Sequence, residues 1–467
     1  MALDGKSGAP NGDQGPYLGS FAGNGGAVRL RYKGPKHLLT FGPPGANKSA
    51  GLVVPNIAHL PRSLIVIDPK GQLAAITAQQ RATLGRVIVL NPFGVFADKL
   101  PHLKSAGWNP LLQLDPASPD FAGDAVSVGD ALIEKSGGNG GNSKFFETSA
   151  ENLVTALAMW ERHANGDKAD FRNIRLELAS PSVFGKKASE PIAGLLHTLK
   201  QMSECDFYPL RVAGGRAYAR LTDANSQSTS LQDVIDTILK ELRFLDDPRM
   251  AYDMSRGAID FGALHREITT IYLILPVHEL TAQAKWLRLF VNLALRSLYK
   301  SPPTFGASLP PVMFMLDEFA HLGRLEEIVK ALGASRDYSI QLWMFLQNFG
   351  QLKQHYKDEW AMFFTGAGAV TAFAPRDWET AEHLAKMCGE KQEEIRTDQT
   401  NTTGGPRGGS VAPQAIPLVR PEDLMRLERG HTLNLIEPCP WPLLARVPVY
   451  PQTQYGAGLD PNPYYRG

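Results

Sequence analysis

A lysine and a serine follow a glycine- and proline-rich turn near the start of the sequence. The segment LLTFGPPGANKSAGLVVPN predicts a short strand, a turn and a helix that begins at Lys48 and Ser49. In such a loop the backbone N–H groups converge on phosphate oxygens, and the helix N-terminus adds partial positive charge. The lysine neutralises the outer phosphates of a nucleotide, and the serine hydroxyl binds Mg²⁺. The candidate phosphate-binding residues are Gly42, Gly45, Ala46, Asn47, Lys48 and Ser49, and Ser49 is also a candidate metal ligand.

Asn47 departs from the usual pattern, which has a glycine directly before the lysine. Asparagine adopts a positive φ more readily than most non-glycine residues, so the loop conformation can survive, although the side chain can crowd the phosphates. Taken alone, the segment fits two alternatives. It can be a phosphate-binding loop, or an ordinary glycine-rich turn with a surface lysine.

Two adjacent acidic residues, Asp317 and Glu318, directly follow an apolar run in PPVMFMLDEFAHLG. The run predicts a buried strand, and two carboxylates at its end are costly to bury without a cation. Asp317 can hold Mg²⁺ through water, and Glu318 can orient and deprotonate the water that attacks a γ-phosphate. The alternative is a strand that leads into a solvated acidic helix start. Together with the lysine-serine loop, the pair favours an ATP hydrolase that uses ATP and Mg²⁺.

The bulk composition gives no further functional signal. Among the 467 residues, 48 basic and 47 acidic side chains leave a net charge of +1, so no global field indicates nucleic acid, membrane or an acidic ligand. Three widely spaced cysteines, Cys205, Cys388 and Cys439, indicate a reducing compartment. No apolar run approaches the roughly 18 residues of a membrane helix, and the N-terminus does not resemble a secretory signal. We therefore expect a cytoplasmic protein.

Short apolar runs bounded by turn residues predict an α/β fold with a mainly parallel sheet. The expected strands are 37–41, 64–67, 87–90, 269–275, 312–316, 342–346 and 370–373. Between the third and fourth of these runs the pattern becomes helical, which predicts an inserted all-α domain. Glycine-rich segments at 135–144 and 402–410 predict mobile loops. The expected organisation is a flexible arm at 1–28, a nucleotide-binding domain in two parts at 29–121 and 263–450, an all-α domain at 122–262, and a tail at 451–467.

Several further motifs occur in the order typical of one family. After the loop come SLIVIDPKGQLAA, RVIVLNPFG and WNPL, and downstream come the acidic strand and GASRDYSIQLWMFLQN. With these motifs, most of the chain resembles the coupling-protein ATPases of type IV secretion and bacterial conjugation, which belong with the RecA-type hexameric DNA pumps. The resemblance implies a RecA-like P-loop NTPase domain, with the helical insertion at the position of that family's all-α domain.

The resemblance also assigns roles to three residues. Arg336 would be an arginine finger that reaches the γ-phosphate of a neighbouring subunit, Gln347 would sense the same phosphate, and Lys36 would be a second basic residue acting in trans. Without the resemblance, Arg336 and Lys36 would be interpreted as surface residues and Gln347 as the end of a strand. Asp68 and Lys70 can likewise be structural turn residues.

The implied function is an ATP-driven pump that moves single-stranded DNA with an attached relaxase, or protein effectors, into a type IV secretion channel. The resemblance further implies a homo-hexamer at the cytoplasmic face of the inner membrane, with substrate selection by the helical insertion. The family usually begins with two membrane helices, which this sequence lacks. Two alternatives remain at this stage, namely a double-stranded DNA translocase and a nucleotide-binding cargo receptor with little turnover, which Asn47 favours.

Overall fold

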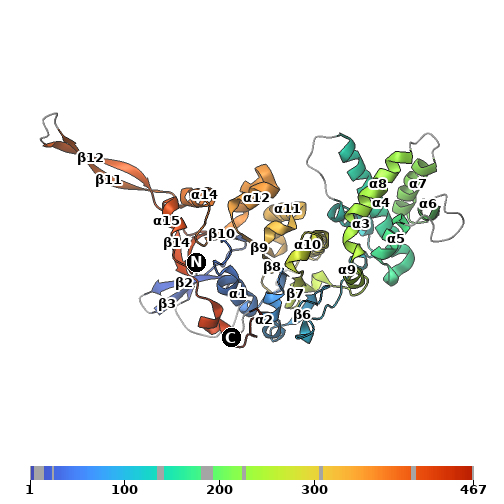
Figure 1. Ribbon diagram of the computed structural model, residues 1–467, viewed down its shortest axis with the longest axis horizontal. Helices are drawn as coiled ribbons and strands as arrows, with labels where there is room; N and C mark the ends of the chain where they lie inside the picture. The colour runs from blue at the N-terminus through green and yellow to red at the C-terminus, as the bar shows by residue number, and fades with distance from the viewer. Residues whose placement is uncertain are drawn as a thin grey trace.

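A single large sheet forms the centre of the computed structural model (Figure 1). The structure describes residues 2–4, 15–23, 26–133, 141–179, 193–222, 228–303, 309–400 and 406–464. Within these residues the sheet has 12 strands, and its central part is parallel, in the order β10, β4, β9, β8, β5, β7, β6. The parallel strands are β4 His37–Phe41, β5 Leu64–Asp68, β6 Arg86–Leu90, β7 Thr269–Ile274, β8 Val312–Leu316, β9 Ile340–Leu346 and β10 Ala367–Ala372.

Each strand of this parallel part corresponds to one of the apolar runs in the sequence, so the expected α/β fold class is confirmed. Every residue of β4, β5, β7, β8, β9 and β10 is buried, as expected for strands covered on both faces. Successive residues point to opposite faces, so that Leu39 and Phe41 join one core and Leu38 joins the other.

Helices cover both faces of the parallel strands. The core that contains Leu38 is closed by α1 and α2, and the core that contains Leu39 is closed by α10 to α13. The carboxyl ends of the strands therefore emerge between two helical layers, where ligands bind in open α/β sheets. The bounds are α1 Val54–His59, α2 Gln72–Ala82, α10 Ala284–Lys300, α11 Glu326–Ala334, α12 Phe349–Tyr356 and α13 Ala361–Gly366.

Five antiparallel strands extend the sheet beyond β10. Their order is β13, β14, β2, β3, β1, and their bounds are β1 Ala2–Asp4, β2 Tyr17–Gly23, β3 Gly26–Arg31, β13 His431–Ile436 and β14 Leu443–Arg446. The prediction of a flexible arm over residues 1–28 is therefore wrong where this segment is described. Tyr17 and Leu18 are buried in the core with Leu30, so a few apolar residues suffice to hold a glycine-rich segment as a strand. Residues 5–14 lie outside the described residues.

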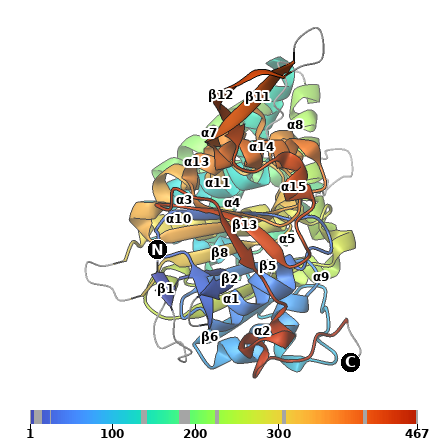
Figure 2. The same ribbon diagram turned by 90° about the vertical axis from the view of Figure 1, so that its left-hand side faces the viewer.

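A two-stranded hairpin projects from the body in both views (Figures 1 and 2). It consists of β11 Glu390–Thr400 and β12 Pro406–Pro417, and it joins α14 Trp378–Cys388 to α15 Pro421–Met425. The mobile loop predicted at 402–410 is corrected in part, because residues 406–410 form part of β12. Their partners on β11 supply the backbone hydrogen bonds that composition alone does not reveal. Residues 401–405 lie outside the described residues.

The helical insertion lies between β6 and β7, at the end of the molecule opposite the hairpin (Figure 1). Its helices are α3 Phe121–Leu132, α4 Gly141–Asn165, α5 Phe171–Ala179, α6 Ala193–Glu204, α7 Tyr208–Thr222, α8 Ser228–Glu241 and α9 Pro248–Asp253. Residues 141–144, which the sequence predicted to be mobile, form the start of α4, whereas 135–140 lie outside the described residues.

Salt bridges attach the insertion to α10, which packs on the large sheet. On α10, Arg296 and Lys300 contact the carboxylate of Asp124 on α3 at 2.8 and 2.7 Å. Lys285, also on α10, pairs with Glu241 on α8 at 2.6 Å. The apolar core also continues between the two parts, so the helices do not form a separate island.

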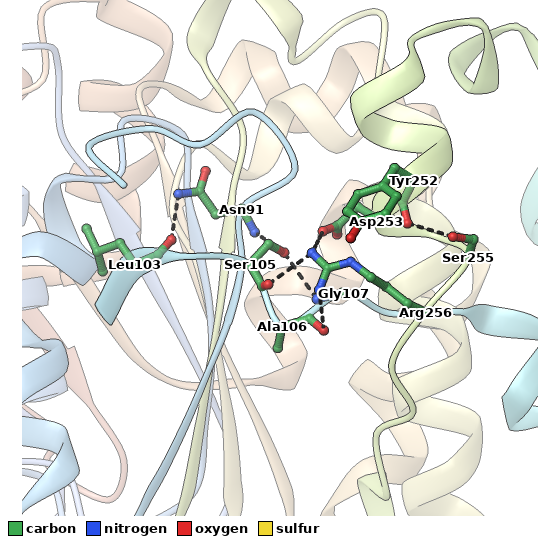
Figure 3. Close-up of polar contacts among 9 residues, drawn as sticks. All are labelled: Asn91, Leu103, Ser105, Ala106, Gly107, Tyr252, Asp253, Ser255 and Arg256. Atoms are coloured by element: carbon green, nitrogen blue, oxygen red, sulfur yellow. Dashed lines mark hydrogen bonds and ion pairs between the residues drawn. The ribbon is translucent and has the colours of Figure 1, made fainter. Parts of the chain in front are cut away.

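The two segments that join the insertion to the sheet cross each other (Figure 3). Trp108 N donates a hydrogen bond to Asp253 O, and Asn109 N donates one to Gly257 O, at 3.0 and 2.9 Å. The Arg256 guanidinium donates to the carbonyl oxygens of Ser105 and Ala106 and also contacts the Asp253 carboxylate. This set of contacts fixes the direction in which the insertion leaves the sheet.

Candidate functional site

The predicted phosphate-binding loop follows β4 and turns over the carboxyl edge of the sheet. Gly42 N donates a hydrogen bond to Leu346 O at the end of β9, at 2.9 Å. Gly45 and Asn47 adopt positive φ values of 77° and 66°, which curl the loop. A Cβ at Gly45 would have no atom within 4 Å, so the space beside this exposed residue is open. The helix expected after Lys48 begins as a π-helical turn, η1 Ser49–Val53, and continues as α1.

Lys48 is a half-buried residue of this loop. Its ammonium group donates a hydrogen bond to Gly42 O. Burial lowers the pKa of Lys48, and the charges of Asp317 and Glu318 act in the opposite direction. The lysine of the early loop and the two carboxylates after the distant strand therefore lie near enough for their charges to interact.

Asp317 and Glu318 follow β8 directly. Burial, and next the charge of Glu318, raise the pKa of Asp317 to about 6, while Lys48 acts to lower it. Glu318 adopts a φ of 52°, an uncommon left-handed conformation for a glutamate. The Gln347 side-chain amide donates a hydrogen bond to the Glu318 carboxylate at 3.3 Å. Gln347 directly follows β9, so three neighbouring parts of the sheet contribute to one cluster.

Asp68 and Lys70 belong to the same edge, although the sequence could equally be interpreted as placing them in a structural turn. The Asp68 carboxylate accepts hydrogen bonds from Ala74 N at 2.8 Å and Lys70 N at 3.4 Å, so it holds the start of α2. Burial, with a smaller contribution from the charge of Asp317, raises the pKa of Asp68 to about 7. Lys70 affects the pKa values of both Lys48 and Asp317. The Asp-Pro-Lys-Gly motif was visible in the sequence, but its position beside β8 depends on the strand order.

Lys36 and Arg336 lie at the amino ends of the parallel strands, opposite the carboxyl edge of the sheet. Lys36 precedes β4 and Arg336 precedes β9, and these strands are parallel neighbours. The length of β4 separates Lys36 from the loop by about 17 Å, at about 3.3 Å per residue. Lys36 pairs with the Glu437 carboxylate at 2.8 Å, and Arg336 is exposed. The structure therefore does not bring these two residues to the Lys48 site of their own chain.

The sequence from residue 8 to residue 450 matches the model of a protein family described as "Type IV secretory system Conjugative DNA transfer". The chain belongs to this conjugative DNA transfer family. The resemblance found from the motifs is thereby confirmed.

Conjugal transfer proteins and VirD4 proteins are identical to this chain at about a quarter of the aligned residues. The conjugal transfer protein TraG of Rhizobium radiobacter is 27% identical over 84% of the chain and 59% of its own length. A TraG of Escherichia coli is 25% identical over 90% of the chain and 66% of its own length. Protein VirD4 of Agrobacterium fabrum is 24% identical over 89% of the chain and 58% of its own length. The chain thus spans about three-fifths of the length of most of these relatives.

Solved structures of TrwB, a bacterial conjugative coupling protein, share the fold. TrwB without ligand covers 92% of the chain with a TM-score of 0.64 at 15% identity, and TrwB with an ATP analogue covers 89% with a TM-score of 0.63 at 14% identity. At this low sequence identity, the similarity supports the fold of this chain and nothing more. Among the described residues, no helix has the length and apolar character needed to cross a membrane.

The residues at the carboxyl edge suit a nucleotide with Mg²⁺. Two adjacent carboxylates, at least one of which is held in a costly buried environment, would be stabilised by a divalent cation. The space beside Gly45 leaves room for phosphate oxygens, and Lys48 in the same loop supplies a positive charge. Ser49 and Asp317 are the side chains that would hold the cation in this family member.

Proposed function

We propose that this chain is an ATP-hydrolysing coupling protein, which pumps single-stranded DNA with an attached relaxase, or protein effectors, into a type IV secretion channel. The observation that carries the proposal is the shared site of Lys48, Asp317, Glu318 and Gln347 in a member of the DNA transfer family. The names of the relatives support the cargo class, since TraG is a conjugal transfer protein.

Each residue of the shared site has one proposed role. Lys48 and backbone N–H groups of the loop at 45–49 bind the phosphates, while Ser49 and Asp317 would hold Mg²⁺, which would neutralise phosphate charge. Glu318 accepts the proton of the attacking water, and the hydrogen bond from Gln347 holds its carboxylate in place. Gln347 is thus positioned to respond when the γ-phosphate leaves.

Lys36 and Arg336 act on the nucleotide of a neighbouring subunit in this proposal. Their place at the amino ends of the strands supports a role in trans. In a head-to-tail ring, this side of one subunit would face the carboxyl edge of the sheet in the next subunit. We propose a homo-hexamer on that basis. TrwB is described as a plasmid coupling protein in complex with ADP and Mg²⁺, which supports the same pair of ligands here.

We propose a separate role for each part of the chain. The two-part nucleotide-binding domain at 29–121 and 263–450 drives movement, the all-α domain at 122–262 selects the cargo, and 451–467 forms a tail. Recruitment to the cytoplasmic face of the inner membrane, where the channel begins, completes the proposal.

Steady-state ATP hydrolysis measured with and without single-stranded DNA tests this function. We expect turnover that needs Mg²⁺ and rises with single-stranded DNA more than with duplex DNA. Lys48→Ala and Glu318→Gln should both lower kcat by at least about 100-fold, because each removes a group that acts on the reacting phosphate. Stronger stimulation by duplex DNA would instead favour the double-stranded DNA translocase.

Asn47 supports a second candidate, a cargo receptor that binds nucleotide but hardly turns it over. Its side chain belongs to the loop itself, at the position where the usual pattern has glycine, and can crowd bound phosphates. The same assay separates the two functions. Tight nucleotide binding with no turnover under any DNA condition would favour the receptor.

A further inference from the structure

An arginine from a distant part of the chain contacts the unusual asparagine of the phosphate loop. The Arg429 guanidinium donates a hydrogen bond to Asn47 Oδ1 at 3.2 Å. Arg429 lies in the short connection between α15 and β13, 382 residues after Asn47 in the sequence. The sequence motifs single out Asn47 but give no reason to pair it with this arginine.

The connection that carries Arg429 is fixed on both sides. His431 N donates to Glu428 O at 3.0 Å, which closes a turn around Arg429, and Val447 N donates to Gly430 O at 2.6 Å. The Val447 side chain presses against the helical turn after the loop, since a Cβ at Gly51 would lie 2.5 Å from Val447 Cγ1. The backbone around Arg429 is therefore held near the loop by these contacts, in addition to the hydrogen bond that its side chain makes.

The need for such a contact follows from the position of Asn47. Its φ of 66° is tolerated by asparagine, but glycine would leave this side of the loop empty. An amide oxygen near bound phosphates adds repulsion between partial negative charges. A guanidinium that binds this oxygen fixes the side chain and offsets its charge.

We propose that Arg429 is a positioning residue for nucleotide binding, which holds the Asn47 side chain in a place compatible with bound phosphates. The loop then accepts asparagine where related loops have glycine. This inference rests on the proposed ATP site, and it predicts that Arg429 matters only while Asn47 is present.

A double-mutant cycle tests this dependence. The Kd of ATP with Mg²⁺ is measured by calorimetry for the unsubstituted chain, Arg429→Ala, Asn47→Gly and the double variant. We expect Arg429→Ala to raise the Kd about five- to tenfold with Asn47 present, and less than about twofold in the Asn47→Gly background, since directly interacting groups couple. KM should rise in parallel while kcat stays nearly constant, because Arg429 acts through the loop and touches no reacting atom.

Controls separate this role from folding and from bulk charge. Arg429→Lys keeps a donor and should recover part of the affinity, whereas Arg426→Ala removes an exposed charge of the same connection and should leave the Kd unchanged. Equal losses in both backgrounds, or no loss with Asn47 present, would overturn the inference. If neither the unsubstituted chain nor Asn47→Gly binds ATP, the proposed function itself fails, which is a separate result.

Discussion

Asp317 is a residue whose charge costs stability in the folded chain. Burial and the neighbouring Glu318 raise its pKa from 3.8 to about 6, so the folded protein binds a proton there more tightly than the unfolded chain does. The ionised form is therefore destabilising above the folded pKa, and the penalty disappears as the pH falls towards the unfolded value. Such a penalty is typical of a group kept for function.

Replacement of Asp317 by asparagine should make the protein without nucleotide more stable at neutral pH. We expect a gain of about 1–2 kcal/mol at pH 7.5, somewhat less than the shift of about two pKa units implies at 1.36 kcal/mol each, because Asp317 keeps some exposure to solvent. The gain should shrink between pH 6 and pH 4, where Asp317 becomes protonated. Urea unfolding at pH 7.5 and pH 4.5 measures the difference, and a gain that grows at low pH would contradict the account.

At the scale of elements, the connections to the helical insertion depend on two closely spaced glycines. Gly107 and Gly257 have φ values of 75° and 79°, and a Cβ at Gly257 would lie 2.3 Å from Gly107 O. The crossing in Figure 3 therefore leaves no space for a side chain at this point. The hydrogen bonds from the Arg256 guanidinium to the carbonyl oxygens of Ser105 and Ala106 join the same two segments.

Gly257→Ala should separate these segments. The added methyl group must displace backbone and also strains a left-handed residue, so we expect a loss of about 2–4 kcal/mol in the free energy of unfolding. Gly166→Ala is a matched control, because Gly166 has a φ of 55° but no atom within 4 Å of the added Cβ. It should cost about 1 kcal/mol. Similar losses for both variants would show that the crossing is not tightly packed.

The elements also show what the sequence could predict. The seven parallel strands were predictable because strands covered on both faces, as six of them are along their whole length, are continuous apolar runs. β2 and the paired part of β12 were not predictable, since glycine-rich segments become strands only when a partner strand and a few buried residues such as Leu18 hold them. In the site, Lys48, Asp317 and Glu318 have motifs of their own. Lys70 also lies in a visible motif, but its position near Lys48 depends on the strand order, and Arg429 has no motif at all.

At the scale of the whole molecule, the candidate groups occupy two edges of one sheet. Lys48, Asp317, Glu318 and Gln347 lie at the carboxyl edge, and Arg336 lies at the opposite edge. A single chain therefore holds two halves of the proposed site that cannot meet. The proposal needs a neighbouring copy of the chain to bring them together.

Mixing two inactive variants should restore activity if the halves come from different subunits. Arg336→Ala lacks only the trans group, and Glu318→Gln lacks only the group that activates water. In an equal mixture with random assembly, about a quarter of the interfaces combine an intact Glu318 with an intact Arg336, so we expect up to about a quarter of the normal rate. ATP hydrolysis in the presence of DNA measures this recovery. A mixture as inactive as its components would contradict a shared site.

The most direct test of the central claim, one MgATP hydrolysis site at the carboxyl edge, is to identify the nucleotide that stays bound. Each variant is incubated with ATP and Mg²⁺, separated from free nucleotide and analysed by chromatography. We expect ADP on the unsubstituted chain, unchanged ATP on Glu318→Gln, and no nucleotide on Lys48→Ala. Retained ATP on Lys48→Ala, or ADP formed by Glu318→Gln at the normal rate, would contradict the account.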